Sequence, residues 1–166
     1  MKAVSLFIIF VILSITMACP VSGKSKKESS FNIMSYNIRM NTPDDGVNAW
    51  PLRKDKVAGL IQFHQADIFG VQEALLVQMN DLKTSFPDFG SVGVGRDDGM
   101  EAGEFMTIFF RKSRFENLES GTFWLSPTPD KPGFGWDAAC NRTCTWIKFK
   151  DKSTKKNFYV FNTHFD

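Results

Sequence analysis

Polar and ionisable side chains stand at the ends of three apolar stretches of the sequence. Asn37 ends the first stretch, Gln72 and Glu73 end the second, and Asn162 and His164 end the last. Active sites are commonly built where the ends of strands gather at one edge of a sheet. A carboxylate, carboxamides and an imidazole gathered in this way are suited to binding a metal ion and a phosphate ester.

The chemical type of each side chain indicates a role. Magnesium binds one or two protein carboxylates and completes its shell with substrate phosphate oxygens, and Glu73 offers such a carboxylate. Asn37 offers an amide that holds a water or a phosphate oxygen beside the ion. His164 offers a hydrogen bond to a phosphate oxygen whose charge grows in the transition state. We assign further contacts to the phosphate or the rest of the substrate to Arg142, Asn162 and Asp166.

Each of these residues, taken alone, also has a purely structural interpretation. Glu73 opens a predicted helix, where the helix dipole favours a carboxylate. Asn37 and Asn162 are of a type that is common in turns. His164 fits a half-buried histidine with one hydrogen-bonded nitrogen, and Arg142 fits a partner in a surface ion pair. The functional interpretation therefore depends on the combination of residues.

The pattern of apolar residues predicts helices early in the chain and antiparallel strands later. Apolar residues recur at helical spacing in 52–65 and 74–86, and Pro51 and Pro87 stand where the first helix begins and the second ends. His64 lies on the apolar side of the first helix, so we expect it in the core. Runs rich in apolar, aromatic or β-branched residues predict strands at 31–39, 66–73, 105–115, 117–126, 142–151 and 156–166. This order indicates an α+β fold or a layered sandwich with helices outside.

The first 30 residues differ in composition from the rest of the chain. Residues 1–18 combine one lysine, an apolar run and a small-residue end, which is typical of a secretory signal peptide and short for a membrane span. A lipoprotein with its lipid on Cys19 is one alternative, and a true membrane anchor is another. Residues 19–30 form a polar linker, and the folded domain comprises residues 31–166. These features predict a secreted, periplasmic or cell-envelope protein.

The composition is that of a soluble globular domain, with a net charge of only +2. Such a small charge gives no strong field that would attract nucleic acid or an anionic membrane. Cys140 and Cys144 are four residues apart, and in a strand their Cα atoms would lie roughly 13 Å apart. That separation is too large for a disulfide, so we expect two free thiols.

The order of these motifs along the chain resembles the endonuclease/exonuclease/phosphatase superfamily of metal-dependent hydrolases. Asn37 in SYNIR, Glu73 in QEA and His164 in NTHFD match the first-strand asparagine, the metal-binding glutamate and the first histidine of this family. Arg142 lies in GWDAACNRTCTW, which is similar to a stretch of many secreted bacterial members. Glu104 lies in GEFMTIFFR, which resembles a further family strand. The resemblance implies a two-layer β-sandwich flanked by helices, the DNase-like four-layer α/β/β/α fold, truncated here to roughly its first half.

For function, the resemblance implies hydrolysis of phosphate esters by in-line attack of water, with Mg²⁺ or Mn²⁺ on Glu73. His164 and Asn37 would be catalytic, and Glu104 and Gln72 would support the site from behind. The family's GDFN-like segment and late aspartate–histidine pair do not occur in these 166 residues. We therefore expect this chain to be inactive by itself.

The resemblance also sets expectations about partners. The partner is a phosphate-ester substrate, and nucleic acid is an option that the charge does not indicate. Contact with a membrane is expected only through the signal peptide or a lipid anchor, and the complete protein is expected to be a monomer. Two other classes stay open, namely a secreted binding module without chemistry and a non-functional fragment.

Overall fold

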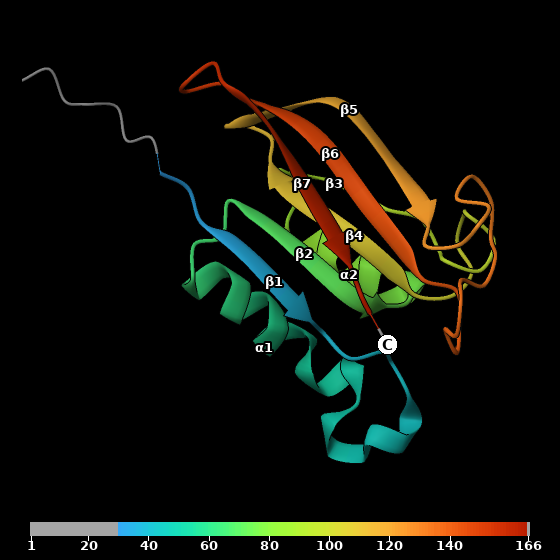
Figure 1. Cartoon of the computed structure of the whole chain (residues 1–166). Helices are drawn as coiled ribbons and strands as arrows, with labels where there is room; N and C mark the ends of the chain where they lie inside the picture. Colours follow the sequence, from blue (N-terminus) through green and yellow to red (C-terminus); the bar gives the residue numbers. More distant parts are fainter. Residues whose placement is uncertain (1–29, 166) are drawn as a thin grey trace, which may run out of the picture.

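Two β-sheets pack face to face in the computed structural model, which describes residues 30–165 (Figure 1). The first sheet consists, in spatial order, of β1 (Ile33–Asn37), β2 (Ile68–Ala74), β4 (Phe105–Arg111) and β3 (Phe89–Val92). The second sheet consists, in spatial order, of β5 (Phe115–Trp124), β6 (Thr143–Asp151) and β7 (Asn157–Thr163). Strands β1, β2 and β7 run toward the same end of the molecule, so their last residues are brought close together.

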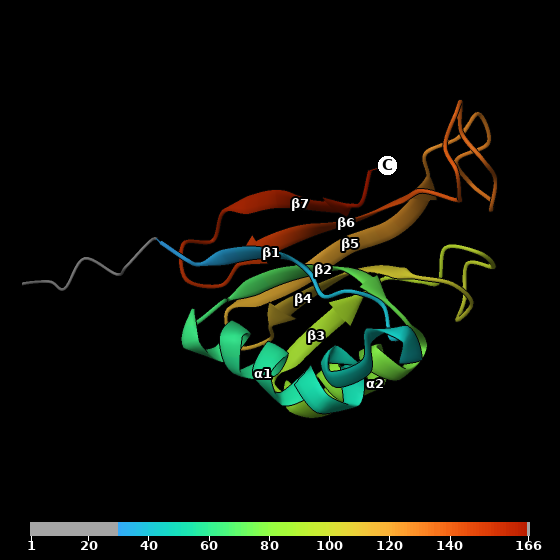
Figure 2. The same cartoon turned by 90° about the horizontal axis from the view of Figure 1, so that it is seen from below.

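The helices lie on the outer face of the first sheet (Figure 2). The short 3-10 helix η1 (Pro43–Asn48) and α1 (Trp50–Phe63) connect β1 to β2, and α2 (Leu76–Ser85) follows β2. β1 and β2 pair in parallel, as strands joined through a helix do, whereas the other strand pairs are antiparallel. The described residues thus form three layers, and they confirm the predicted sandwich flanked by helices.

Alternating side chains of β4 contribute to two separate hydrophobic cores. Phe105 and Phe109 pack in the core between the helices and the first sheet. Ile108 and Phe110 pack in the core between the two sheets, where Ile147 of β6 is also fully buried. A strand buried on both faces reads as a continuous apolar run, which is why this segment was recognisable in the sequence.

Two elements were not predicted, and one predicted position is wrong. β3 and η1 lie in segments without a clear apolar period. His64 is not in the core, because it is the exposed residue at the C-terminal end of α1. The helix begins earlier than predicted, at Trp50, whose buried indole Nε1 donates to Asp81 Oδ2 at 2.8 Å. This contact ties the first turn of α1 to α2.

Some predictions fall outside the part of the chain that the structure describes. These are the signal peptide, the lipidation of Cys19, almost all of the linker, and Asp166, and they stay predictions. Within residues 30–165, no helix is long and apolar enough to span a bilayer. Cys140 and Cys144 carry free thiols, as predicted, and Cys144 is buried.

Candidate active site

Glu73 lies at a bulge near the end of β2, in a backbone conformation that is unusual for its type. The pairing of β2 with β4 shifts register between Val71 and Ala74. The φ of Glu73 is +62°, in the left-handed region that costs an L-residue about 1–2 kcal/mol. Bulges re-aim the side chains that they carry, and backbone strain of this kind clusters at functional sites. Here the bulge turns the carboxylate toward the segment that follows β1.

Both oxygens of the Glu73 carboxylate accept a hydrogen bond, one from the last residue of β1 and one from the segment that follows it. Asn37 Nδ2 donates to Oε1 at 2.7 Å, and the Met40 N–H donates to Oε2 at 3.1 Å. The Arg39 N–H fixes Asn37 in turn by donating to its Oδ1 at 2.9 Å. A carboxylate has about four lone-pair sites, so each oxygen can still bind a cation.

The pKa of Glu73 lies below the usual value for a glutamate. Partial burial of the carboxyl raises its pKa, but hydrogen bonds from Asn37 and Met40 and the electrostatic effects of the nearby His164 and Arg39 together lower it by more. Glu73 is therefore ionised at neutral pH, which is the form in which a carboxylate binds a metal ion.

His164 and Arg142 complete the cluster from the second sheet. His164 Nε2 lies 4.0 Å from Glu73 Oε1, and His164 Nδ1 lies 3.4 Å from Arg142 Nη1. Arginine has only donors, so Nδ1 is the acceptor, and the proton of the neutral imidazole is assigned to Nε2, which faces Glu73. The side chains of Glu73 and His164 keep 18% and 28% of their surface exposed, so a ligand can reach them. We call Asn37, Glu73, Arg142 and His164 the site cluster.

A buried glutamine supports the loop that carries the donors to Glu73, and sequence analysis missed it. The amide of Gln78 in α2 accepts from the N–H groups of Asn41 (2.7 Å) and Leu75 (3.1 Å) and donates to the carbonyl of Arg39 (2.9 Å). Arg53 of α1 donates to the same carbonyl at 2.7 Å. A buried glutamine must have hydrogen-bond partners, so the full burial of Gln78 indicates that it holds neighbouring backbone groups. The sequence does not show that burial, and the residue was therefore missed.

Asn162 and Gln72 lie behind the site cluster. Asn162 is only 6% exposed, and its amide donates to the carbonyls of Val71 (2.9 Å) and Thr107 (3.0 Å). Its Oδ1 accepts from Gln72 Nε2 at 2.6 Å. These partners occupy the amide, so the geometry argues against the predicted contact of Asn162 with substrate. Gln72 also contacts Ser35 Oγ at 3.2 Å, which agrees with its predicted supporting position.

Glu104 lies farther from the site cluster and, among residues 30–165, makes no hydrogen bond or ion pair with it, so its predicted supporting role stays a prediction. Arg96 Nη1 donates to Glu104 Oε2 at 2.7 Å, and this largely buried pair orders the loop before β4. In the same loop, Asp97 Oδ1 accepts from Asn141 Nδ2 at 3.2 Å. Asn141 immediately precedes Arg142, so this loop contacts the segment that carries Arg142.

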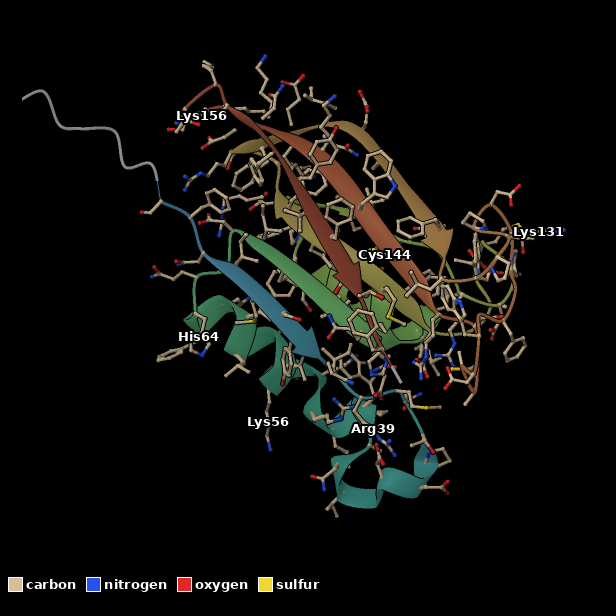
Figure 3. All side chains as sticks on the ribbon, viewed as in Figure 1. Arg39, Lys56, His64, Lys131, Cys144 and Lys156 are labelled. Carbon is tan, nitrogen blue, oxygen red and sulfur yellow. The ribbon has the colours of Figure 1, made fainter. Side chains whose placement is uncertain are left out.

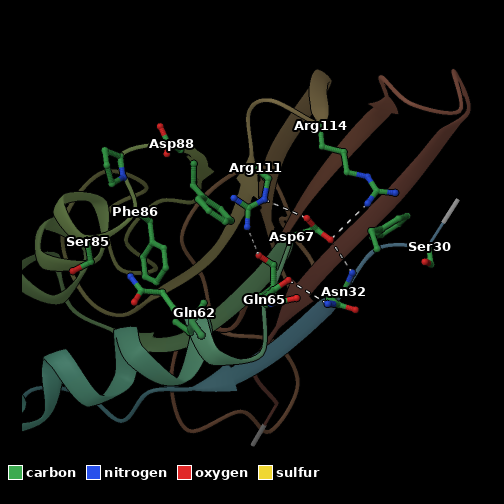
Figure 4. Close-up of a pocket in the computed structure, with 15 residues that line it drawn as sticks. Ser30, Asn32, Gln62, Gln65, Asp67, Ser85, Phe86, Asp88, Arg111 and Arg114 are labelled. Atoms are coloured by element: carbon green, nitrogen blue, oxygen red, sulfur yellow. Dashed lines mark hydrogen bonds and ion pairs between the residues drawn. The ribbon is translucent and has the colours of Figure 1, made fainter. Parts of the chain in front are cut away.

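A pocket of about 630 Å³ lies at the other end of β1 and β2, away from Glu73 (Figure 4). Two arginines in it converge on Asp67, with Arg111 Nε 3.2 Å from Oδ1 and Arg114 Nη1 3.7 Å from Oδ2. Arg114 also lies 3.7 Å from a carboxylate oxygen of Asp151. Each guanidinium in this pocket thus already faces a carboxylate.

Comparison with solved structures identifies the fold. The endonuclease/exonuclease/phosphatase protein of Bacteroides vulgatus is 48% identical to this chain, with a TM-score of 0.77 over 81% of this chain and 51% of that one. The mannosyl-6-phosphatase of Bacteroides thetaiotaomicron VPI-5482 is 44% identical, with a TM-score of 0.80 over 82% of this chain and 52% of that one. The chain belongs to the endonuclease/exonuclease/phosphatase family.

The chain spans about half the length of the family members that it matches. Among curated proteins, the uncharacterized protein L388 of Acanthamoeba polyphaga mimivirus is 27% identical over 143 residues, which is 81% of this chain and 53% of that protein. No family model matches the chain. ANGEL2, a 2',3'-cyclic phosphatase at 20% identity and a TM-score of 0.65, shares the fold. Proteins of this family are phosphoester hydrolases, as the mannosyl-6-phosphatase illustrates.

Glu73 is the one member of the site cluster with an anionic oxygen. Across residues 30–165, no three or more His, Cys, Asp or Glu side chains are grouped so as to hold a metal. A single carboxylate with open lone pairs nevertheless fits Mg²⁺, which keeps several waters and takes substrate oxygens as further ligands. The same cluster does not fit zinc, which requires three or four protein ligands.

Proposed function

We propose that this chain carries the metal- and phosphate-binding part of an exported, magnesium-dependent hydrolase of phosphate esters, with Mn²⁺ as the alternative ion. The observation that carries the proposal is the strained and ionised Glu73, held by Asn37 and Met40, with His164 Nε2 at 4.0 Å. Family membership supports the reaction class. The composition of residues 1–18 supports export.

Each residue of the site cluster has a distinct task in this proposal. Glu73 binds the ion, which when bound would neutralise charge that develops on the phosphate oxygens. His164 donates its Nε2 proton to a phosphate oxygen bound beside Glu73. Arg142 holds the imidazole through Nδ1 and adds positive charge. Asn37 fixes the carboxylate and lowers its pKa.

The described residues bind and stabilise the phosphate better than they activate water. His64, the other histidine of the chain, lies at the opposite end of β1 from Arg39 (Figure 3). Thus no second imidazole among residues 30–165 is placed to take a proton from the attacking water. We expect the 166-residue chain to bind metal while hydrolysing phosphate esters slowly, because catalytic residues act as a group.

Metal binding tests the proposal on the chain itself. In a Mn²⁺ titration followed by electron paramagnetic resonance, Glu73→Gln should weaken binding by at least about tenfold, which corresponds to about 1.4 kcal/mol. The matched control is Glu119→Gln, which removes an exposed carboxylate that pairs with Lys148 at 3.0 Å. The control should bind Mn²⁺ like the wild type. Unchanged binding by Glu73→Gln would remove the metal from the proposal and favour a non-catalytic binding module.

The substrate class can be tested with the same protein. The 44% identity with a mannosyl-6-phosphatase supports a sugar phosphate monoester as the first candidate. Calorimetry in Mg²⁺ should show binding of mannose 6-phosphate that disappears with a chelator. Stronger binding of a dinucleotide would reverse this order of candidates in favour of a nuclease.

A further inference from the structure

The layer between the two sheets changes from apolar to polar next to the site cluster. One buried side chain, Asn162 of β7, reaches across this layer to two strands of the first sheet. It donates to the carbonyls of Val71 in β2 and Thr107 in β4, at 2.9 and 3.0 Å. Val71 and Thr107 are register partners at the point where the bulge interrupts the ladder. Asn162 therefore supplies hydrogen bonds at a place where a bulge disrupts backbone pairing.

A glycine in β2 provides the space for this amide. A Cβ on Gly70 would lie 2.7 Å from Asn162 Oδ1 and 2.8 Å from Asn162 Cγ, closer than such atoms approach one another. The backbone of Gly70 has an ordinary negative φ, so its conformation does not require glycine. The requirement comes from the close approach of the second sheet.

The contacts of Asn162 link β2, which carries Glu73, to β7, which His164 closely follows. Asn162 Oδ1 accepts from Gln72 Nε2 at 2.6 Å. Gln72 immediately precedes Glu73, and Asn162 stands two residues before His164. The distance between the carboxylate and the imidazole, 4.0 Å, thus spans two sheets that are joined nearby by one buried amide.

We propose that Asn162 is a positioning residue that sets the approach of His164 to Glu73, and that Gly70 exists to admit it. This inference rests on the proposed function, because it concerns the same metal and phosphate site. Residues that orient a metal ligand from behind commonly change metal affinity about 10–100-fold when replaced. A core hydrogen bond without a positioning role would lower stability and leave the geometry of the site unchanged.

The geometry can be tested without metal, by nuclear magnetic resonance at a fixed neutral pH. In the wild type, Glu73→Gln should shift the ring signals of His164 and leave those of His64 in place, because His64 lies at the far end of β1. In the Asn162→Ala background, the same change at Glu73 should leave the His164 signals nearly unmoved. A full response in Asn162→Ala would overturn the inference.

Two further variants separate positioning from stability. Gly70→Ala pushes the amide away without removing it, so it should reproduce the loss of response in His164, and it should add little to Asn162→Ala. Ile147→Val removes a methylene from the core between the sheets, and it should lower stability while the response of His164 stays intact. If Asn162→Ala does not fold, Asn162→Ser, which keeps one donor, should show a partial loss.

Mn²⁺ affinity gives the second readout. Asn162→Ala and Gly70→Ala should each weaken Mn²⁺ binding by about tenfold or more, and Ile147→Val should change it less than about twofold. Wild-type affinity in both site variants would count against the inference. Failure of the wild type to bind Mn²⁺ would count against the proposed function instead, and the response of His164 would still decide the role of Asn162.

Discussion

Asn37→Ala removes the shorter of the two hydrogen bonds to the Glu73 carboxylate, and its effect should depend on pH. A hydrogen bond to a charged group contributes about 1.5–3 kcal/mol. Glu73 keeps 18% of its side-chain surface exposed, so water replaces part of the lost bond, and the Met40 N–H still serves the other oxygen. We therefore expect the free energy of unfolding at pH 7 to fall by about 1–2 kcal/mol.

The direction of the pKa shift determines how this loss varies with pH. The pKa of folded Glu73 is lower than in the unfolded chain, so its stabilisation is complete above the unfolded value of about 4.3. That stabilisation disappears as the pH falls through the folded pKa. Asn37 is one cause of the low pKa, so Asn37→Ala raises it. The stability curves of wild type and variant should converge between pH 7 and pH 3.

Chemical denaturation at both pH values measures this difference, and carbon-13 resonance of the Glu73 carboxyl group reports its titration. Asn117→Ala is the matched control, because Asn117 Nδ2 donates at 3.0 Å to the neutral hydroxyl of Ser120. Its small effect should be the same at both pH values. If Asn37→Ala costs as much at pH 3 as at pH 7, the bond does not act through the ionised carboxylate, and the explanation of the low pKa fails.

Two further variants test the support of the site and the surface beside it. Gln78→Leu leaves the N–H groups of Asn41 and Leu75 without their acceptor and should cost about 2–4 kcal/mol in urea denaturation. Asn80→Ala on the exposed face of α2 should stay within about 0.5 kcal/mol, and an equal loss would remove the special role of Gln78. Phe161, 60% exposed on the free edge strand β7, should promote self-association. Phe161→Lys should raise the monomer fraction in sedimentation velocity, and an unchanged fraction would show that this edge is not the contact.

The strands that could be predicted from the sequence are those whose own residues form a recognisable apolar run. The run at 105–115 was recognisable because β4 is covered on both faces. β3 was not recognisable, because it has four partly buried residues and includes Gly90. A side chain at Gly90 would collide with the ring of Phe110, so glycine is required there by a contact with a distant strand. The strand propensity and the apolar alternation of residues 89–92 give no information about that contact.

The members of the site cluster could be predicted from the order of residue types, but the role of Asn162 could not be read in the same way. Its type suggested a substrate contact at a strand end. The alternation within β7 contained the correcting signal, since Phe158 and Val160 pack into the core between the sheets. A residue two positions after Val160 points to the same face. For Asn162, the two-residue alternation of the strand thus predicts the face to which the side chain points better than its residue type does.

Glu73 shows why residue type alone is not enough at such a site. A left-handed backbone at φ +62° would be relaxed for glycine and is strained for glutamate. The strain persists because Asn37 and Met40 hold the carboxylate, and both lie on a segment that turns through the left-handed Arg39. The bulge, the turn and the two donors thus depend on one another. The same few hydrogen bonds therefore hold both the loop after β1 and the carboxylate that faces the imidazole of the second sheet.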